Sequence, residues 1–251
     1  MINIRGKFAT YGEVWFDEDP PRQPSVDVLM FRQRPSPIDG RPCKPFLSLV
    51  NDLTLSEDVI RAAFGHTNRY EIKRAESKDG LETEFFIDPC AQLEEFSEYY
   101  DAFARLKGLS PAYRRGLAAA CDAGQLVLSR ASKQARSLVW HAYVKHGQKA
   151  ALLHSASHFR NTQNSDTALL ARANRWLHWR DMLRLKQLGV LQYDWGGIFE
   201  DESDPARAGI NNFKRQFGGR SERTYNCHLP ITMKGKAYLA VRNTLGRLKK
   251  I

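Results

Sequence analysis

Cysteine is scarce in this sequence, and its few cysteines form no recognisable pattern. They are Cys43, Cys90, Cys121 and Cys227, and no two of them make a C-x-x-C pair. Zinc sites and the disulfide frameworks of small secreted domains both show characteristic cysteine spacings, so neither is indicated here. We therefore expect reduced, partly buried thiols and no metal site.

Long apolar runs are missing as well. A membrane-spanning helix takes roughly 20 consecutive apolar residues, and the chain contains no such stretch. Residues 1–10 lack the apolar core of a secretory signal peptide. Heptad runs, internal repeats and low-complexity segments are also lacking. These absences predict a cytoplasmic protein with no integral membrane segment, and they leave peripheral attachment at the inner membrane surface open.

What remains is an ordinary globular composition with an excess of positive charge. The 251 residues include 38 Lys and Arg against 28 Asp and Glu, which gives a net charge of +10. This length fits a single domain over residues 1–251, with an N-terminal β extension (1–52) and a core (53–251). The charge favours an anionic partner such as a nucleotide-sugar, an acyl donor or transfer RNA. The oligomeric state is left open.

The most informative stretch runs from residue 169 to residue 219. Apolar residues at helical spacing predict a helix over 169–189 with one buried face, ended by a glycine. Asn174, His178 and Asp181 lie roughly opposite that face, so we expect this polar stripe to be solvated or to line a groove. His178 is then the best-placed group for proton transfer near neutral pH, and a simply solvated histidine is the alternative.

A short strand over 190–195 follows this helix and ends at Gly196 and Gly197. Ligands of open α/β sheets bind outside the carboxyl ends of the strands, which places Asp194 and the glycine pair where a site is expected. Asp194 could orient an amine or act as a base. It could instead cap the glycine turn through a backbone hydrogen bond.

The order of the predicted elements indicates the fold class. From residue 54 onward the pattern gives helix, strand, two helices, a strand and a hairpin, and then helix, strand, helix, strand and helix. Such an order favours an α/β (α+β) fold, with a mixed, mainly antiparallel central sheet flanked by helices. The strands predicted over residues 1–52 extend the same sheet.

Three histidines lie in the predicted hairpin, whose turn is Gly147-Gln148. A two-residue loop sets His141 opposite His154, and His158 lies on the same face as His154 because side chains alternate along a strand. Three histidines on one face could bind a substrate or a metal, or could move protons. A hydrogen-bonded pair with a structural role is the alternative.

Three short motifs resemble those of the Fem family. They are Asn174-Arg175-Trp176, Tyr193-Asp194-Trp195-Gly196-Gly197-Ile198 and Phe213-Lys214-Arg215-Gln216-Phe217-Gly218-Gly219. Residues 69–75 and 96–108 add a weaker likeness in the same order. Fem proteins are peptidoglycan-bridge aminoacyltransferases that have the fold of the GNAT acetyltransferases.

The resemblance implies a GNAT-like fold and an acyl- or aminoacyl-transferase that modifies an amino group of a cell-envelope, polysaccharide or peptidoglycan precursor. It implies acyl-CoA or aminoacyl-tRNA as the donor substrate and no firm cofactor. Asp194 and His178 are then the candidate catalytic residues. The candidate substrate-binding residues are Asn174, Arg175, Trp195, Gly196, Gly197, Lys214, Arg215, Gly218 and Gly219, with His141 and His154 added from the hairpin.

Two features depart from these families. Segment 158–166, where GNAT enzymes hold the coenzyme A pyrophosphate on a glycine-rich loop, contains no glycine. Fem enzymes carry two such domains and most carry a coiled-coil arm, whereas this chain has room for about one domain. The alternative function is therefore a catalytically inactive GNAT-like scaffold or binding protein in a polysaccharide or lipid pathway.

Overall fold

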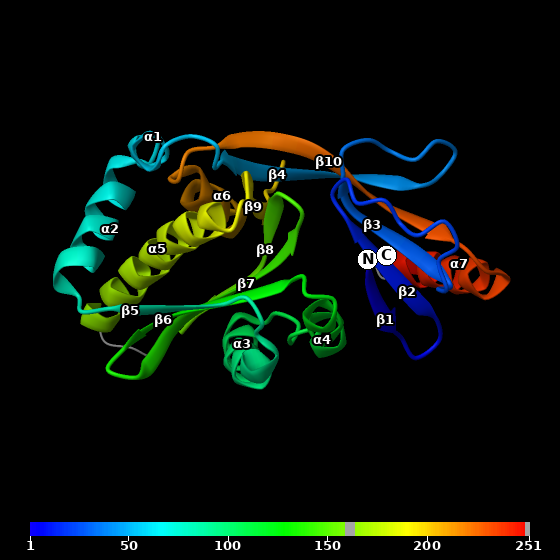
Figure 1. Ribbon diagram of the computed structural model, residues 1–251, viewed down its shortest axis with the longest axis horizontal. Helices are drawn as coiled ribbons and strands as arrows, with labels where there is room; N and C mark the ends of the chain where they lie inside the picture. The colour runs from blue at the N-terminus through cyan, green and yellow to red at the C-terminus, as the bar shows by residue number, and fades with distance from the viewer. Residues whose placement is uncertain (159–163, 249–251) are drawn as a thin grey trace. The chain divides into compact units, whose positions relative to one another are not determined.

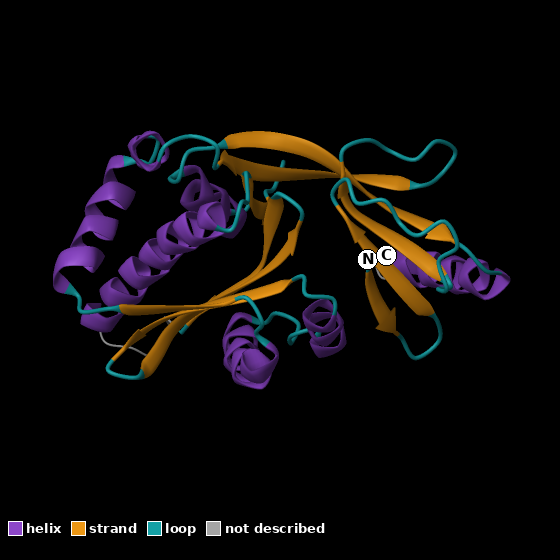
Figure 2. Ribbon diagram, in the orientation of Figure 1, coloured by secondary structure: helices purple, strands orange, loops and turns teal. Residues whose placement is uncertain are grey.

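The computed structural model of the chain describes residues 1–158 and 164–248. Contacts divide the chain into two compact units, one made of residues 1–46 and the residues from 223 onward, the other of residues 47–222. Ten strands are hydrogen-bonded in the order β1-β2-β3-β10-β4-β9-β8-β7-β6-β5, and helices accompany them (Figures 1 and 2). The single domain over residues 1–251, with its extension ending at residue 52, stays a prediction.

The first unit is a small sheet with one helix. It contains β1 (Ile2–Arg5), β2 (Thr10–Trp15), β3 (Val28–Arg34), most of β10 (Arg220–Pro230), and α7 (Met233–Leu248). β2 and β3 run parallel, and the β1–β2 and β3–β10 pairs are antiparallel. Val14, Leu29 and Phe31 form its apolar core together with Cys227.

The second unit holds the larger sheet and most of the helices. Its strands are most of β4 (Cys43–Asp52), together with β5 (Glu82–Phe86), β6 (Leu126–Lys133), β7 (Arg136–His146), β8 (Lys149–Ser157) and β9 (Gln192–Gly197). Its helices are α1 (Glu57–Ala62), α2 (His66–Lys78), α3 (Leu93–Lys107), α4 (Arg114–Asp122), α5 (Asn164–Gln187) and α6 (Pro205–Arg215). β8 and β9 run parallel, and the β4–β9, β5–β6, β6–β7 and β7–β8 pairs are antiparallel.

Helices cover both faces of this second sheet. α5 packs on β6, β7 and β8 with α2 beside it, whereas α3 and α4 lie on the opposite face (Figure 1). β7 is consequently buried from Leu138 to Val144, as expected for a central strand with both faces covered. The predicted fold class, a mixed and mainly antiparallel sheet flanked by helices, is confirmed.

Local sequence signals set most of the element boundaries. The Ser56 hydroxyl accepts a hydrogen bond from the Val59 amide at the start of α1, and Gly108 ends α3 in the left-handed conformation at φ +67°. The 169–189 prediction corresponds to α5, which begins five residues earlier. Among the described residues, none of the helices is both long and apolar enough to cross a membrane.

The hairpin turn lies where the sequence predicts it, but the predicted pairing of His141 with His154 is wrong. Gly147 has φ +53°, and beside the turn Lys145 pairs with Ala150 as predicted. A β-bulge between Ala142 and Tyr143 then shifts the register by one residue, so Ala142 pairs with His154 and His141 with Ser155. A one-residue shift moves every later side chain to the other face.

His154 and His158 therefore lie on the α3 face of the sheet. The His154 ring packs 4.3 Å from the ring of Tyr100, and burial lowers its pKa to about 4. His158 packs edge-on against Tyr99 at 4.3 Å. His141 points to the α5 face instead, so the three histidines do not form one group.

The expectation of four reduced cysteines is also wrong. Cys43 and Cys227 are joined by a disulfide, as are Cys90 and Cys121. The partners lie 184 and 31 residues apart in sequence, so only the tertiary pairing of their elements brings them together. Disulfides persist in oxidising compartments and are rare in the cytosol. The two bonds therefore give no support to the cytoplasmic location expected from the sequence, which stays a prediction.

Removing the bond between Cys43 and Cys227 should destabilise the protein strongly. A disulfide that closes a loop of this length restricts the unfolded chain, so the double substitution Cys43→Ala/Cys227→Ala should lower the free energy of unfolding by about 4 kcal/mol. Urea unfolding without reductant measures the change, and Cys90→Ala/Cys121→Ala, which opens a shorter loop, should cost less. Alkylation of all four cysteines in the unreduced wild-type protein would contradict the assignment.

Candidate functional site

A network of buried polar side chains lies between α5 and the sheet. The side chains of His178 and Asp181 are each 1% exposed, and Asn174 is half-buried. The expectation that this stripe is solvated or lines a groove is wrong for His178, whereas Asp181 is not solvated but lines a cavity beside β5. Because α5 is sandwiched between α2 and the sheet, nearly all of its circumference is covered, and its polar groups find partners on the sheet.

Asp181 is the centre of this network. Its Oδ2 atom accepts hydrogen bonds from the Ser129 hydroxyl at 2.9 Å and the Tyr143 hydroxyl at 2.6 Å, and it lies 2.7 Å from His141 Nδ1. On the other side of the ring, His141 Nε2 lies 2.9 Å from Asn174 Oδ1. Three strand side chains are thus held by one carboxylate oxygen.

The network continues to His178 through two tyrosines. The hydroxyls of Tyr143 and Tyr193 lie 3.0 Å apart, and the Tyr193 hydroxyl lies 2.7 Å from His178 Nδ1. Burial, together with the nearby Asp181 charge, raises the pKa of both tyrosines well above the usual value. Burial and the stacked His141 ring, at 4.0 Å, hold the pKa of His178 well below its usual value. His178 is therefore neutral at pH 7.

A second group of charges lies at the carboxyl end of β9. Asp194 accepts hydrogen bonds from the Ser48 hydroxyl at 2.8 Å and from the Gly196 amide at 2.6 Å. Burial raises the pKa of Asp194 to about 6, although both hydrogen bonds oppose the shift. Lys214 donates to the Gly197 carbonyl at 2.6 Å, and burial lowers its pKa to about 8. The capping hydrogen bond that the sequence suggested for Asp194 is thus present, beside a lysine.

The strands β8 and β9 separate beside Asp194. They pair only through Lys149, Ala150 and Ala151, although β8 continues to Ser157. Gly196 has φ +70°, and a Cβ atom there would lie 3.0 Å from the Leu152 carbonyl oxygen. A glycine is therefore needed where the two backbones pass each other before they diverge.

The rest of the glycine-rich motif is held together by Asn51 of β4. Its side chain accepts from the Trp195 indole at 2.6 Å and donates to the Phe217 carbonyl at 2.9 Å. Gly219 has φ +87°, and a Cβ atom on it would lie 2.6 Å from the Val50 carbonyl oxygen. Gly218 has φ +69°, and a Cβ atom on it would lie 3.0 Å from the Ala63 carbonyl oxygen. These contacts give Trp195, Gly218 and Gly219 a packing role.

The two predicted arginines lie apart from Asp194 in different surroundings. Arg175 donates to Asn68 Oδ1 at 2.8 Å and stacks over the Phe213 ring at 5.4 Å, and burial lowers its pKa. Arg215 is exposed and bonds to Glu202 at 2.6 Å. The structure therefore brings together Asp194, Gly196, Gly197 and Lys214, and separately Asn174, His141 and His178. Sequence reasoning missed Ser48, Asn51 and Tyr143, because isolated polar residues in strands give no spacing signal.

Substitution of Asn51 should loosen the glycine-rich motif. Asn51→Ala leaves the buried Trp195 indole and the Phe217 carbonyl without their partner, which should lower the free energy of unfolding by about 2 to 3 kcal/mol. Chemical unfolding measures this, with Asn212→Ala at an exposed position of α6 as the matched control. Equal stability of the two variants would contradict a bridging role.

The buried Asp194 carboxyl should make stability depend on pH. Its folded-state pKa of about 6 lies above the ordinary 3.8, so it stabilises the protein at low pH and this contribution is lost as the pH rises through 6. Relative to wild type, Asp194→Asn should therefore gain about 2 kcal/mol between pH 4 and pH 7. Urea unfolding of both proteins across this range tests the sign; a pH-independent difference would show an unperturbed carboxyl.

Comparison with known proteins supports the fold at low sequence identity. No family model matches the chain, and no curated protein does. Among solved structures, FemX has a TM-score of 0.59 at 14% identity, covering 72% of this chain and 61% of its own. The C-terminal domain of a putative lysylphosphatidylglycerol synthetase from Agrobacterium fabrum gives 0.53 at 14% identity, with 84% and 71% covered. L-PGS from Bacillus licheniformis gives 0.51 at 10% identity, with 86% and 72% covered.

The chain therefore has a Fem/GNAT-like fold, and the resemblance noted in the sequence is confirmed at the level of the fold. It spans about three fifths of the FemX chain. The glycine-free segment 158–166 adds nothing to this comparison, because residues 159–163 lie outside the described residues.

Proposed function

We propose that this chain is an acyl- or aminoacyl-transferase that moves its group onto an amine. The observation that carries the proposal is the carboxyl end of β9, where Asp194 and Lys214 lie beside the point at which β8 and β9 part. Acyl transfer to an amine needs a base for the amine and a positive or hydrogen-bonding group for the oxyanion that forms on the acyl carbon. A carboxylate and an ammonium group of altered pKa meet both needs.

The two residues take different roles in this mechanism. Asp194, with a pKa of about 6, is ionised at pH 7 and still basic enough to accept a proton from the attacking amine. The amine nitrogen forms a bond to the acyl carbon, and the bond from that carbon to the donor's leaving group breaks. Lys214, positive below its pKa of about 8, stabilises the negative charge on the carbonyl oxygen during the step.

The substrates are inferred from the fold and from charge. The similar structures include FemX and a protein named for making lysylphosphatidylglycerol. The net charge of +10 favours an anionic donor, either acyl-CoA or aminoacyl-tRNA. The glycine-free segment 158–166 counts against a coenzyme A pyrophosphate, which favours the aminoacyl donor. The acceptor on this proposal is an amino group of a cell-envelope or polysaccharide precursor.

A second candidate is a non-catalytic scaffold or binding protein. Both oxygens of Asp194 already accept hydrogen bonds, from Ser48 and from Gly196, which is the arrangement expected of a carboxylate that only shapes the end of the strand. A transfer assay separates the two candidates.

Transfer to amine acceptors should depend on Asp194 far more than stability does. With an aminoacyl-tRNA pool or acyl-CoA as donor, Asp194→Asn should lower kcat by about a hundredfold or more, since a general base contributes at least that much. Arg207→Gln, on the exposed side of α6, is the control. The wild-type rate should rise with pH through about 6 and fall above about 8, following the ionisation of Asp194 and Lys214.

The outcome distinguishes the two candidates. Loss of transfer in an Asp194→Asn protein that is still folded at the pH of the assay supports the enzyme. Binding of a donor by the wild-type protein without any transfer, or equal rates in wild type and Asp194→Asn, supports the scaffold.

A further inference from the structure

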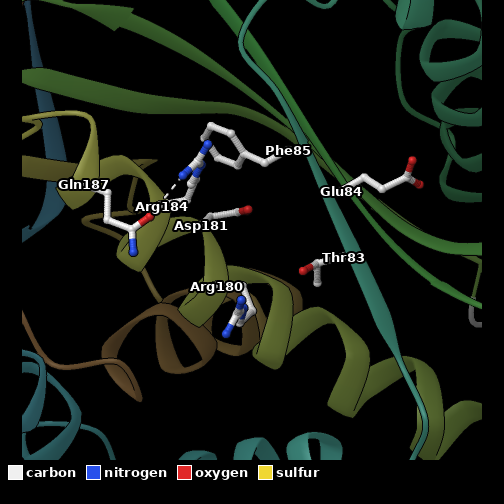
Figure 3. Close-up of a pocket in the computed structure, with 7 residues that line it drawn as sticks. All are labelled: Thr83, Glu84, Phe85, Arg180, Asp181, Arg184 and Gln187. Carbon is white, nitrogen blue, oxygen red and sulfur yellow. Dashed lines mark hydrogen bonds between the residues drawn. The ribbon is translucent and has the colours of Figure 1, made fainter.

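A cavity of about 320 Å³ lies between the edge strand β5 and the C-terminal half of α5. β5 contributes Thr83, Glu84 and Phe85, and α5 contributes Arg180, Asp181, Arg184 and Gln187. Figure 3 shows the Asp181 side chain directed toward β5, with the two arginines before and after it along the helix. The volume is at the lower end of the range for small-molecule sites.

Asp181 has an oxygen left over for a ligand. Its Oδ2 atom is held by Ser129, His141 and Tyr143. No hydrogen bond from the residues that the structure describes reaches Oδ1, although the side chain is 1% exposed and lines the cavity. Because Oδ2 is already occupied, Oδ1 is the atom of Asp181 that can accept from a positively charged donor in the cavity.

The arginines of the cavity are not neutralised by that carboxylate. Within the described residues, neither Arg180 nor Arg184 forms an ion pair with Asp181, and Arg184 donates only to the neutral Gln187 at 3.1 Å. The remaining acid, Glu84, is bound by Arg130 on the opposite side of β5. The cavity thus offers one negative group and two positive groups that are held apart.

We propose that this cavity binds a free α-amino acid. The ammonium group of the ligand binds Asp181 Oδ1, and its carboxylate binds the guanidinium group of Arg180 or of Arg184, whose planar shape suits a carboxylate. The Phe85 ring provides an apolar surface for the ligand's side chain. A simple anion would leave Asp181 facing a like charge, and a simple amine would leave both arginines without a partner. The inference rests on the cavity alone and not on the proposed transferase activity.

Binding of matched probes to the whole protein tests this directly. Isothermal titration with L-leucine should give saturable binding at millimolar concentrations. L-leucine methyl ester, which lacks the carboxylate, and N-acetyl-L-leucine, which lacks the ammonium group, should each bind about tenfold more weakly or worse, because each loses a charge-assisted contact. Acetate and inorganic phosphate are the probes for a simple anion site.

Substitutions then locate the binding. Arg180→Gln/Arg184→Gln, at exposed positions, should weaken L-leucine binding about tenfold or more, whereas Arg74→Gln on the exposed side of α2 should leave it unchanged. Asp181→Asn should abolish it, and the arginine variants and the probes decide the question if that protein does not fold. No binding of L-leucine, of glycine or of L-alanine at about 10 mM would overturn the proposal. So would binding of acetate, phosphate or either derivative as tight as that of L-leucine.

Discussion

The structure of the second unit depends on one buried carboxylate. α5 enters the core with polar residues on a face that is covered by the sheet, and a buried polar group without a partner costs several times what a hydrogen bond contributes. Asp181 resolves this by holding Ser129, His141 and Tyr143 from β6 and β7. The helix can then sit on the sheet in only one register. Apolar contacts alone would allow it to slide.

The β-bulge in the hairpin belongs to the same constraint. It brings His141 opposite Ser155, and the side chains of both residues bind Asn174 Oδ1 on α5. Without the shift, His154 would lie opposite His141 on the α5 face, and Ser155 would turn to the other face. The β-bulge in β8 and the polar stripe of α5 therefore depend on each other. A change in either would leave polar groups of the other without hydrogen-bond partners.

The two candidate sites differ in their relation to this network, because Asp181 belongs to it and Asp194 is joined to it only through the backbone of β9. Asp181 borders the cavity beside β5, and the hydroxyls of Tyr143 and Tyr193 connect it to His178. Tyr193 is the residue before Asp194 on β9, whose side chain points to the opposite face and bonds Ser48. The glycine-rich motif completes the arrangement, because its glycines let β9 and the end of α6 pass close to β4, where Asn51 joins them. Burial of the Asp194 side chain is what raises its pKa.

Local chemistry in the sequence determined most of the helices, the Gly147 turn, the end of α3 at Gly108 and the order that gives a mixed sheet, because each follows from periodicity or from the conformational preference of a single residue. It also placed Asp194 near a strand end. The separation of α2 from α1 was not predicted. Only the tertiary structure decided that His178 and Asp181 are buried, since a helix between two layers hides the face that periodicity assigns to solvent. It likewise decided the split of His141 from His154, which one inserted residue produces, and the two disulfides, whose cysteines meet only when distant strands and helices pack. The bridging role of Asn51 and the cavity beside Asp181 were also decided by the tertiary structure, because contacts between residues far apart in the chain leave no local pattern in the sequence.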